Sequence, residues 1–208
     1  SGKTQLYLRA TARCISQDKT AIILVPEIIL TDQIVKRFVE TFGDEVVVFH
    51  SKLTVQQRNN NWERLRRKDS HIIIGARSAV FAPAEDIGLI VVDEEHDTSY
   101  KQEDMVRYHA RNVALWRAEA HGCPVILGSA TPSVTSYYKA KQGEYHLLEL
   151  PNRIFEQSMR KVTIVDMKEE ILHGHYSVFS DAMSRLIQHT LDEHNQMIIL
   201  LNRRGYNT

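Results

Sequence analysis

The chain has 208 residues, 43% hydrophobic and 25% charged, as expected for a globular protein with one substantial core and the beginning of a second. The 26 Lys and Arg residues balance the 26 Asp and Glu residues, so no overall basic field indicates nucleic acid and such a contact needs a local groove. Two cysteines without CxxC spacing argue against a disulfide framework or zinc site and fit a reducing cytoplasm, and no apolar run could cross a bilayer.

The chain opens with Ser1-Gly2-Lys3-Thr4, which reads as the end of a phosphate-binding loop, Gly-x-x-x-x-Gly-Lys-[Ser/Thr], running into a helix. In such a loop the lysine contacts the β- and γ-phosphates and the threonine hydroxyl binds Mg²⁺. We therefore expect these four residues to bind ATP, although a surface turn before a helix gives the same short pattern. The strand and first glycine that normally precede the loop are missing, so we expect an excised piece of a longer protein.

Short aliphatic runs alternate with helical patterns along the next part of the chain. The runs predict buried parallel strands at 21–25, 46–49, 72–74, 89–92 and 125–127. Helices are expected between them, from a cap at Thr31 to a stop at Gly43, over Thr54–Lys68, and over Tyr108–His121 before Gly122. This alternation predicts an α/β fold with a doubly wound, mainly parallel sheet.

The fourth of these runs ends in Asp93-Glu94-Glu95-His96. Acidic side chains at the carboxyl end of a buried parallel strand lie where open α/β sheets bind ligands. We expect Asp93 to hold Mg²⁺ and Glu94 to polarise the water that attacks the γ-phosphate. His96 is expected at the nucleotide's edge as a relay, unless a backbone carbonyl satisfies it. A solvated charged loop has the same composition, but its order and spacing relative to the phosphate loop favour NTP hydrolysis.

Aromatic and basic side chains interleave directly after this cluster, at Tyr100, Lys101, Arg107, Tyr108, His109 and Arg111. Bases stack on aromatic rings, and Arg and Lys meet phosphates, so this segment is a candidate for sensing single-stranded DNA. The alternative is that Tyr108 packs in the core as part of a helix and only Tyr100 is free.

The strand at 125–127 is followed by Gly128-Ser129-Ala130-Thr131-Pro132-Ser133. The hydroxyls of Ser129 and Thr131 are expected to hydrogen-bond the His96 region and to shift when phosphate leaves. A strand-to-helix turn capped by Ser133 explains the same segment, and both interpretations can hold.

The pattern loosens after Pro151 and then restarts with a strand at 162–165, a helix near 180–193 and a strand at 197–201. We therefore expect three parts: residues 1–150 as a first lobe, 151–161 as a linker, and 162–208 as the start of a second α/β lobe.

The chain resembles the primosomal replication-restart helicases of helicase superfamily two. Six segments carry the resemblance to motifs I, Ia, Ib, II, III and IV, in that order: Ser1–Thr4, Leu24–Ile28, Gly75–Pro83, Asp93–His96, Ser129–Pro132 and Leu201–Tyr206. The most specific parts are Arg77–Pro83 and Asp93–Gln102, since generic helicases share only the Asp-Glu-x-His core. The resemblance implies two RecA-like lobes and ATP- and Mg²⁺-dependent 3′ to 5′ translocation on, and unwinding of, forked DNA in the bacterial cytoplasm.

The resemblance also implies single-stranded and forked DNA, primosome proteins and single-strand-binding protein as partners, with no membrane. Pro26, Arg77 and Ser78 would line the DNA track. Zinc and the arginine finger would come from parts of the family absent here, so the isolated chain is expected to bind ATP poorly and to be inactive.

Two alternatives remain open. Other superfamily-two motors, such as restriction-enzyme translocases and branch-migration helicases, share motifs I, II and III, but the aromatic-basic segment and Asn202–Tyr206 argue against them. A non-catalytic DNA-binding module would keep the fold without turnover, and the intact Glu94 argues against that for the parent protein.

Overall fold

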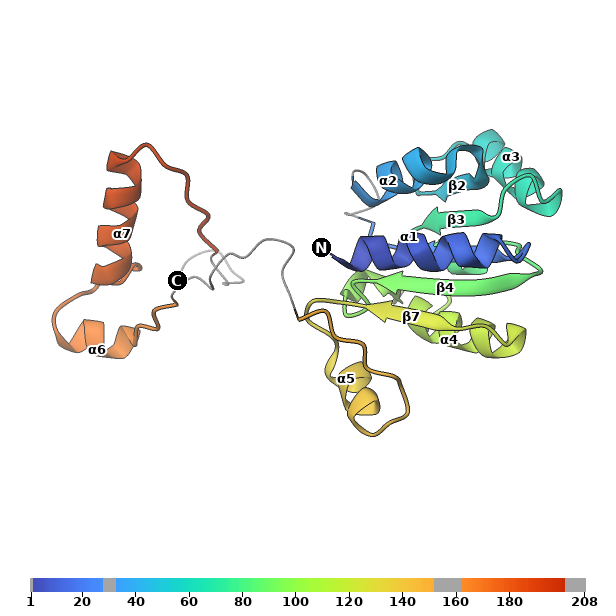
Figure 1. Cartoon of the computed structure of the whole chain (residues 1–208). Coiled ribbons are helices and arrows are strands. Elements are labelled where there is room, and N and C mark those ends of the chain that lie inside the picture. The colour runs from blue at the N-terminus through green and yellow to red at the C-terminus, as the bar shows by residue number, and fades with distance from the viewer. Residues whose placement is uncertain (1, 28–32, 152–161, 201–208) are drawn as a thin grey trace. The chain divides into compact units, whose positions relative to one another are not determined.

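The computed structural model describes residues 2–27, 33–151 and 162–200 (Figure 1). The chain divides into two compact units, Ser1–Glu156 and Gln157–Thr208, and the boundary falls within the segment 151–161 assigned as a linker. Across the described ranges, no helix combines the length and apolar character that a membrane span requires.

The first unit is built on a five-stranded parallel sheet with the strand order β2-β3-β1-β4-β7. Its strands are β1 (Thr20–Leu24), β2 (Val46–Phe49), β3 (Ile72–Gly75), β4 (Ile87–Asp93) and β7 (Val125–Gly128). Each of the five aliphatic runs predicted in the first lobe is a strand, which confirms the predicted parallel sheet. The central strand β1 is buried on both faces, as its unbroken apolar run requires.

Helices cover both faces of the sheet, and Figure 1 shows α1 in front of the sheet, running along the strands. The helices of this unit are α1 (Gly2–Ile15), α2 (Gln33–Phe42), α3 (Val55–Arg66), α4 (Ala110–His121) and α5 (Val134–Lys141). Tyr7 of α1 and Phe38 of α2 pack with Ala21 and Ile23 in one core. The alternate β1 residues belong to a second core with α3 and α4, formed with Leu65, Ala110, Ala114 and Ala118. Two cores on opposite faces confirm the doubly wound arrangement.

Most helix ends follow from local sequence. Thr54 and Gln57 form a capping box at the start of α3, and Gly122, with φ +61°, ends α4 as predicted. The predicted start of that helix at Tyr108 is wrong. Tyr108–His109 (β6) instead pairs antiparallel with Lys101–Gln102 (β5), and this pairing satisfies backbone groups that a helix would otherwise use. The predicted cap Thr31 lies outside the described residues.

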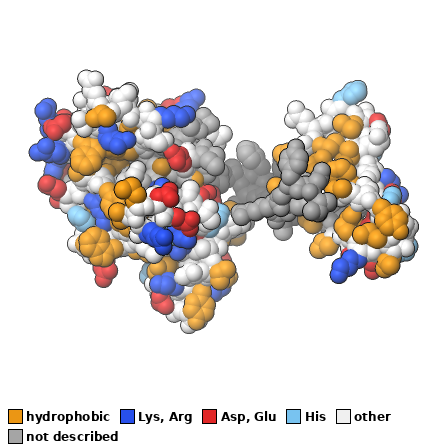
Figure 2. Space-filling view, turned by 180° about the vertical axis from the view of Figure 1, so that it is seen from behind, with side chains coloured by type: hydrophobic (Ala, Val, Ile, Leu, Met, Phe, Trp, Pro, Cys, Tyr) orange, Lys and Arg blue, Asp and Glu red, His pale blue; other side chains and the backbone are white. Residues whose placement is uncertain are grey.

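The second unit contains two helices in its described part, α6 (Met167–Leu172) and α7 (Asp181–Asp192). The helix predicted near 180–193 is confirmed as α7, and Ser180 caps it. The strands predicted at 162–165 and 197–201 are wrong over their described residues. No neighbouring strand in the described part of this unit pairs with them, and Ile164 and Ile198 are 92% and 99% exposed. Figure 2 shows hydrophobic side chains across the surface of this unit.

Candidate nucleotide site

The start of α1 lies beside the carboxyl end of β4, which brings Lys3 to two carboxylates, one of them 91 residues further along the chain. The Lys3 Nζ atom is 2.5 Å from Glu94 Oε1 and 3.7 Å from Asp93 Oδ1. Thr4 follows Lys3 in the first turn of the helix, while Ser1 lies outside the described residues. The structure therefore groups the expected phosphate-binding lysine with the expected metal-binding and water-activating carboxylates.

Two buried tyrosines fix the position of Asp93. The Tyr7 hydroxyl donates to Asp93 Oδ1 at 2.9 Å, and the Tyr100 hydroxyl donates to the Asp93 backbone oxygen at 2.7 Å. Burial raises the pKa of both tyrosines well above the usual value, and the negative charge of Asp93 raises it further, so both hydroxyls stay protonated as donors.

The donor set fits a hard divalent cation such as Mg²⁺. Among the described residues, no hydrogen-bond donor reaches the second carboxylate oxygen of Asp93. Carboxylate and hydroxyl oxygens are the ligands that Mg²⁺ accepts from proteins, usually alongside several waters and the substrate phosphates. Asp93 and Thr4 could therefore supply the protein's share of a magnesium site.

The close approach of Tyr7 to Asp93 depends on a residue without a side chain in the neighbouring strand. Gly128 pairs with Asp93 in the sheet, and a Cβ atom built on it would lie 1.6 Å from the Tyr7 hydroxyl oxygen. Only glycine at this position leaves room for the phenol.

Glu94 lies in a left-handed backbone conformation, with φ +45°, where β4 turns away from the sheet. The turn is closed by a hydrogen bond of 2.8 Å from the Asp97 backbone N–H to the Glu94 backbone oxygen. Non-glycine residues adopt this conformation at a cost and are often found at functional sites. The turn aims the Glu94 side chain at Lys3.

His96 contacts the two hydroxyl residues that follow β7. Its Nδ1 atom is 2.8 Å from Ser129 Oγ, and its Nε2 atom is 3.4 Å from Thr131 Oγ1. Nδ1 is also 3.7 Å from Glu94 Oε2. Ser133 caps α5, so the hydroxyl contacts to His96 and the capped turn occur together. Among the described residues, the partners of His96 are thus two hydroxyls and the Glu94 carboxylate, with no backbone carbonyl among them.

The aromatic-basic segment differs from expectation at its first residue. Tyr100 is fully buried, so the expectation that its ring is free to stack on bases is wrong. Tyr108 is half-buried, and its ring packs edge-on against Phe81 with centroids 5.0 Å apart. Lys101 and Arg107 are exposed, so the segment offers cations, rather than the Tyr100 ring, to a ligand.

Arg77, one of the residues expected to line a DNA track, supports the backbone at the start of the hairpin formed by β5 and β6. Its guanidinium donates to the backbone oxygens of Ser99 and Lys101, at 3.1 and 2.8 Å. Ser78 is exposed. Pro26 is buried and Glu27, the next residue of the same turn, is exposed, so the expected part of this turn in a DNA track stays a prediction. The segment resembling motif IV, at 201–206, lies outside the described residues.

Sequence reasoning missed Tyr7 and gave no role to Glu95. The spacing of Tyr7, four residues after Lys3, puts both on one face of a helix and could have indicated a shared site. Glu95 is 1% exposed, and burial alone would raise its pKa. Hydrogen bonds from the Ser133 backbone N–H and from Arg111 outweigh the burial and hold the pKa below its usual value. Nothing in the order of residues distinguishes this fully buried acid from the half-buried Glu94 beside it.

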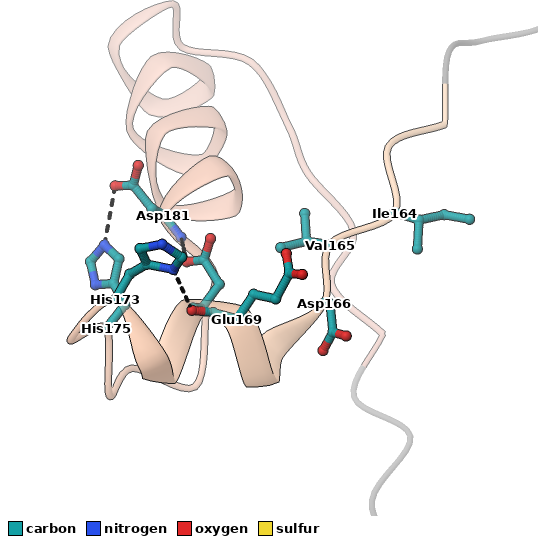
Figure 3. Close-up of a pocket in the computed structure, with 8 residues that line it drawn as sticks. Ile164, Val165, Asp166, Glu169, His173, His175 and Asp181 are labelled. Carbon is teal, nitrogen blue, oxygen red and sulfur yellow. Dashed lines mark hydrogen bonds and ion pairs between the residues drawn. The ribbon is translucent and has the colours of Figure 1, made fainter.

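The second unit contains a separate hollow of about 530 Å³ (Figure 3). Its two histidines are paired with other residues that line it: His175 Nε2 lies 3.3 Å from Asp181 Oδ1, and His173 Nδ1 lies 2.7 Å from the Glu169 backbone oxygen. Within the described ranges, no group of three or more His, Cys, Asp or Glu side chains is placed to hold a metal ion.

Comparison with known proteins gives a family and several close relatives. Residues 1–140 match the family model of the DEAD/DEAH box helicases. Over its whole length the chain is 47% identical to replication restart protein PriA of Bacillus subtilis (strain 168), and it is 41% and 42% identical to the PriA proteins of Synechocystis sp. and Chlamydia pneumoniae. It spans 26%, 26% and 28% of those proteins, about a quarter of their length.

Among solved structures, the crystal structure of the C-terminal part of the Fun30 ATPase domain superimposes with a TM-score of 0.43 and 15% identity, covering 94% of this chain and 54% of that one. This likeness is too low to support any inference.

Proposed function

The chain belongs to the DEAD/DEAH box helicase family, and from that membership we propose that it is the ATP-hydrolysing core of a bacterial replication-restart DNA helicase. The observation that carries the proposal is the position of Lys3, whose ammonium lies 2.5 Å from Glu94 and 3.7 Å from Asp93. A phosphate-binding lysine beside a metal-binding and a water-activating carboxylate is the minimum that NTP hydrolysis requires of a lobe.

Each residue of this site has one role in the proposal. Lys3 would contact the β- and γ-phosphates, and Asp93 and Thr4 would hold Mg²⁺, which when bound would neutralise phosphate charge. Glu94 orients and polarises the attacking water. His96 carries the state of the site to Ser129 and Thr131, whose hydroxyls it contacts.

Hydrolysis is coupled to DNA through the β5–β6 hairpin in this proposal. The exposed cations Lys101 and Arg107 meet the phosphates of single-stranded DNA. Arg77 holds the backbone on both sides of Tyr100, whose hydroxyl binds the Asp93 backbone oxygen. If DNA binding moved the hairpin, these contacts would therefore also move Asp93, the residue proposed to hold the metal.

The finer assignments rest on the similarity to PriA proteins. They are 3′ to 5′ movement along DNA, unwinding of forked DNA in the cytoplasm, and cooperation with primosome proteins and single-strand-binding protein. In the complete protein, both RecA-like lobes would contribute to the nucleotide site. The exposed hairpin cations and the similarity to PriA at 38–47% identity favour this function over a restriction-enzyme motor, a branch-migration helicase or a non-catalytic DNA-binding module.

The test uses the whole parent protein. Phosphate release is measured without DNA, with single strands and with forks, and strand displacement is followed on forks with either a 3′ or a 5′ tail. We expect DNA-stimulated hydrolysis and unwinding, both abolished by Glu94→Gln. DNA binding without any turnover would indicate the non-catalytic module, and stimulation by duplex DNA without strand separation would indicate a duplex translocase.

A further inference from the structure

We infer that Glu95 and Arg111 form a positioning pair that sets the loop Ser129–Pro132 against His96 and links this loop to the β5–β6 hairpin. The inference rests on the proposed function, because it assigns these residues a part in coupling DNA to hydrolysis. Among the described residues, neither side chain hydrogen-bonds to Lys3, Asp93 or Glu94, so both act through others.

The Glu95 carboxylate is the centre of a buried hydrogen-bond cluster. Its Oε2 atom accepts from Arg111 at 2.6 Å, from Ser136 Oγ at 2.9 Å and from Ser133 Oγ at 3.1 Å. Its Oε1 atom accepts from the Ser133 backbone N–H at 2.6 Å. Arg111 also donates to both serine hydroxyls, at 2.8 and 3.3 Å. The buried charge is thus paired and fully hydrogen-bonded, as a buried carboxylate requires.

Glu95 holds both ends of the loop Ser129–Pro132. Its backbone N–H donates to the Gly128 backbone oxygen at 3.0 Å, directly before the loop, and its carboxylate binds the Ser133 N–H directly after it. Between these anchors, Ser129 and Thr131 contact His96, which is the next residue along the chain from Glu95. Residues 95–96 and the loop therefore form one closed unit, and the loop's position against His96 depends on Glu95.

Arg111 connects this unit to the hairpin. It lies in the first turn of α4, directly after β6, and its backbone N–H donates to the side chain of His109 at 3.3 Å. A displacement of β6 would pull on Arg111, whose guanidinium bridges Glu95 and Ser133. The cluster thus gives the hairpin a second route to the hydrolytic site, separate from the contact between Tyr100 and Asp93.

The test compares Glu95→Gln and Arg111→Lys with Arg117→Lys in the whole parent protein. Arg117 is a matched control, because it is also a half-buried arginine of α4 but donates to the backbone oxygens of Val80, Ala82 and Ala84, away from the loop. We expect the two test variants to lower DNA-stimulated kcat by about tenfold while changing the KM for ATP by less than about twofold. The control should leave both parameters unchanged at a comparable melting temperature.

A second readout is independent of turnover. Hydrogen–deuterium exchange of the amides at 129–137 should be faster in both test variants and unchanged in the control. Glu95→Gln removes the charged acceptor of the Ser133 N–H, and Arg111→Lys weakens the arginine contact that holds this acceptor in place. In a Ser129→Ala/Thr131→Ala background, Glu95→Gln should add little further loss of stimulation, since the loop no longer reports to His96.

The outcomes separate the inference from the proposed function. A wild-type parent without DNA-stimulated hydrolysis contradicts the proposed function. A stimulated wild type with test variants that match the control in stimulation and exchange contradicts the inference and leaves the function standing. If Glu95→Gln fails to fold, Arg111→Lys decides, because it keeps the positive charge and alters only the geometry of the bridge.

Discussion

The Tyr7 hydroxyl and the Asp93 carboxylate are joined by a 2.9 Å hydrogen bond between the first helix and the strand that carries the candidate metal ligand. The bond exists because Gly128, in the strand beside Asp93, leaves the phenol its space. A residue on the phosphate-loop helix thus orients a carboxylate oxygen, and a glycine on a third element permits it.

The first prediction concerns this glycine. Gly128→Ala places a methyl group 1.6 Å from the Tyr7 oxygen, so Tyr7 must move and release Asp93. We expect a loss of about 1–3 kcal/mol in the free energy of unfolding, as for other overpacked cores. Urea unfolding measures the stability. Electron paramagnetic resonance measures the Mn²⁺ concentration needed for half-saturation of the nucleotide complex, which should rise if Asp93 has lost its position.

Tyr7→Phe is the control for this prediction. Alone it should destabilise the protein by about 1–3 kcal/mol through the lost hydrogen bond to a charged acceptor. Combined with Gly128→Ala it removes the atom nearest to the new methyl group, so the double variant should be more stable than the sum of the single losses implies. Strict additivity would show that the two residues do not compete for the same space.

The second prediction separates binding from chemistry. Lys3 is shared between Glu94 and the expected phosphates, so Lys3→Ala should weaken ATP binding in the parent protein. Glu94→Gln should spare binding, because it frees Lys3 from its partner, while slowing hydrolysis by about 10²–10⁴-fold. Calorimetric titration with a non-hydrolysable ATP analogue and a phosphate-release assay measure the two effects. Hydrolysis at the parental rate in Glu94→Gln would disprove the role given to that carboxylate.

The third prediction concerns Tyr100. Truncation to alanine would open a core cavity and confound the result, since the ring is fully buried. Tyr100→Phe removes only the hydroxyl that binds the Asp93 backbone oxygen, so DNA-stimulated hydrolysis in the parent should fall more than basal hydrolysis. Tyr138→Phe is the matched control, because that ring is 61% exposed on α5. Equal loss of both rates in Tyr100→Phe would indicate packing alone.

The fourth prediction is a pH dependence of stability. The pKa of Glu95 is depressed in the folded protein, so its ionised form contributes stability above the unfolded-state pKa of about 4.3. This contribution is lost as the pH falls through the lower, folded-state pKa. The difference in unfolding free energy between wild type and Glu95→Gln should therefore be constant near neutral pH and shrink below about pH 4.3.

Glu103→Gln is the control for the pH series. Its carboxylate is also paired, with Lys101 at 2.7 Å, but both side chains are exposed to solvent. Screened surface pairs contribute little to stability, so this variant should follow wild type at every pH. If the difference in unfolding free energy between wild type and Glu95→Gln did not change with pH, the pKa of Glu95 would be the same in the folded and unfolded states.

The first lobe could be predicted from sequence because its strands are buried on both faces. A run such as Ile72–Ile74 has no polar position, and few structures other than a covered parallel strand accommodate it. Capping signals at Thr54 and Gly122 then placed helix ends to within two residues. The expected grouping of Lys3 with Asp93 followed from the rule that ligands bind at the carboxyl ends of strands.

The errors share a physical cause, which is that they depend on partners distant in the sequence. Tyr100 is buried because its hydroxyl finds the Asp93 backbone oxygen, and aromatic residues that follow an active-site strand look alike whether buried or free. Residues 162–165 have the composition of a strand but lack a neighbouring strand in the described part of their unit. In sequence Glu95 looks like Glu94, and its partners Arg111, Ser133 and Ser136 distinguish it in the fold.

The left-handed backbone of Glu94 implies a trade-off between activity and stability at the centre of the site. The left-handed conformation of Glu94 costs the folded protein about 1–3 kcal/mol, and asparagine tolerates this conformation better than glutamate does. The ion pair with Lys3 offsets part of this cost, but nucleotide phosphates compete for the same lysine. An inactive Glu94→Asn protein could therefore match or exceed wild type in resistance to unfolding, and directed evolution for thermal tolerance alone would tend to erase the catalytic carboxylate.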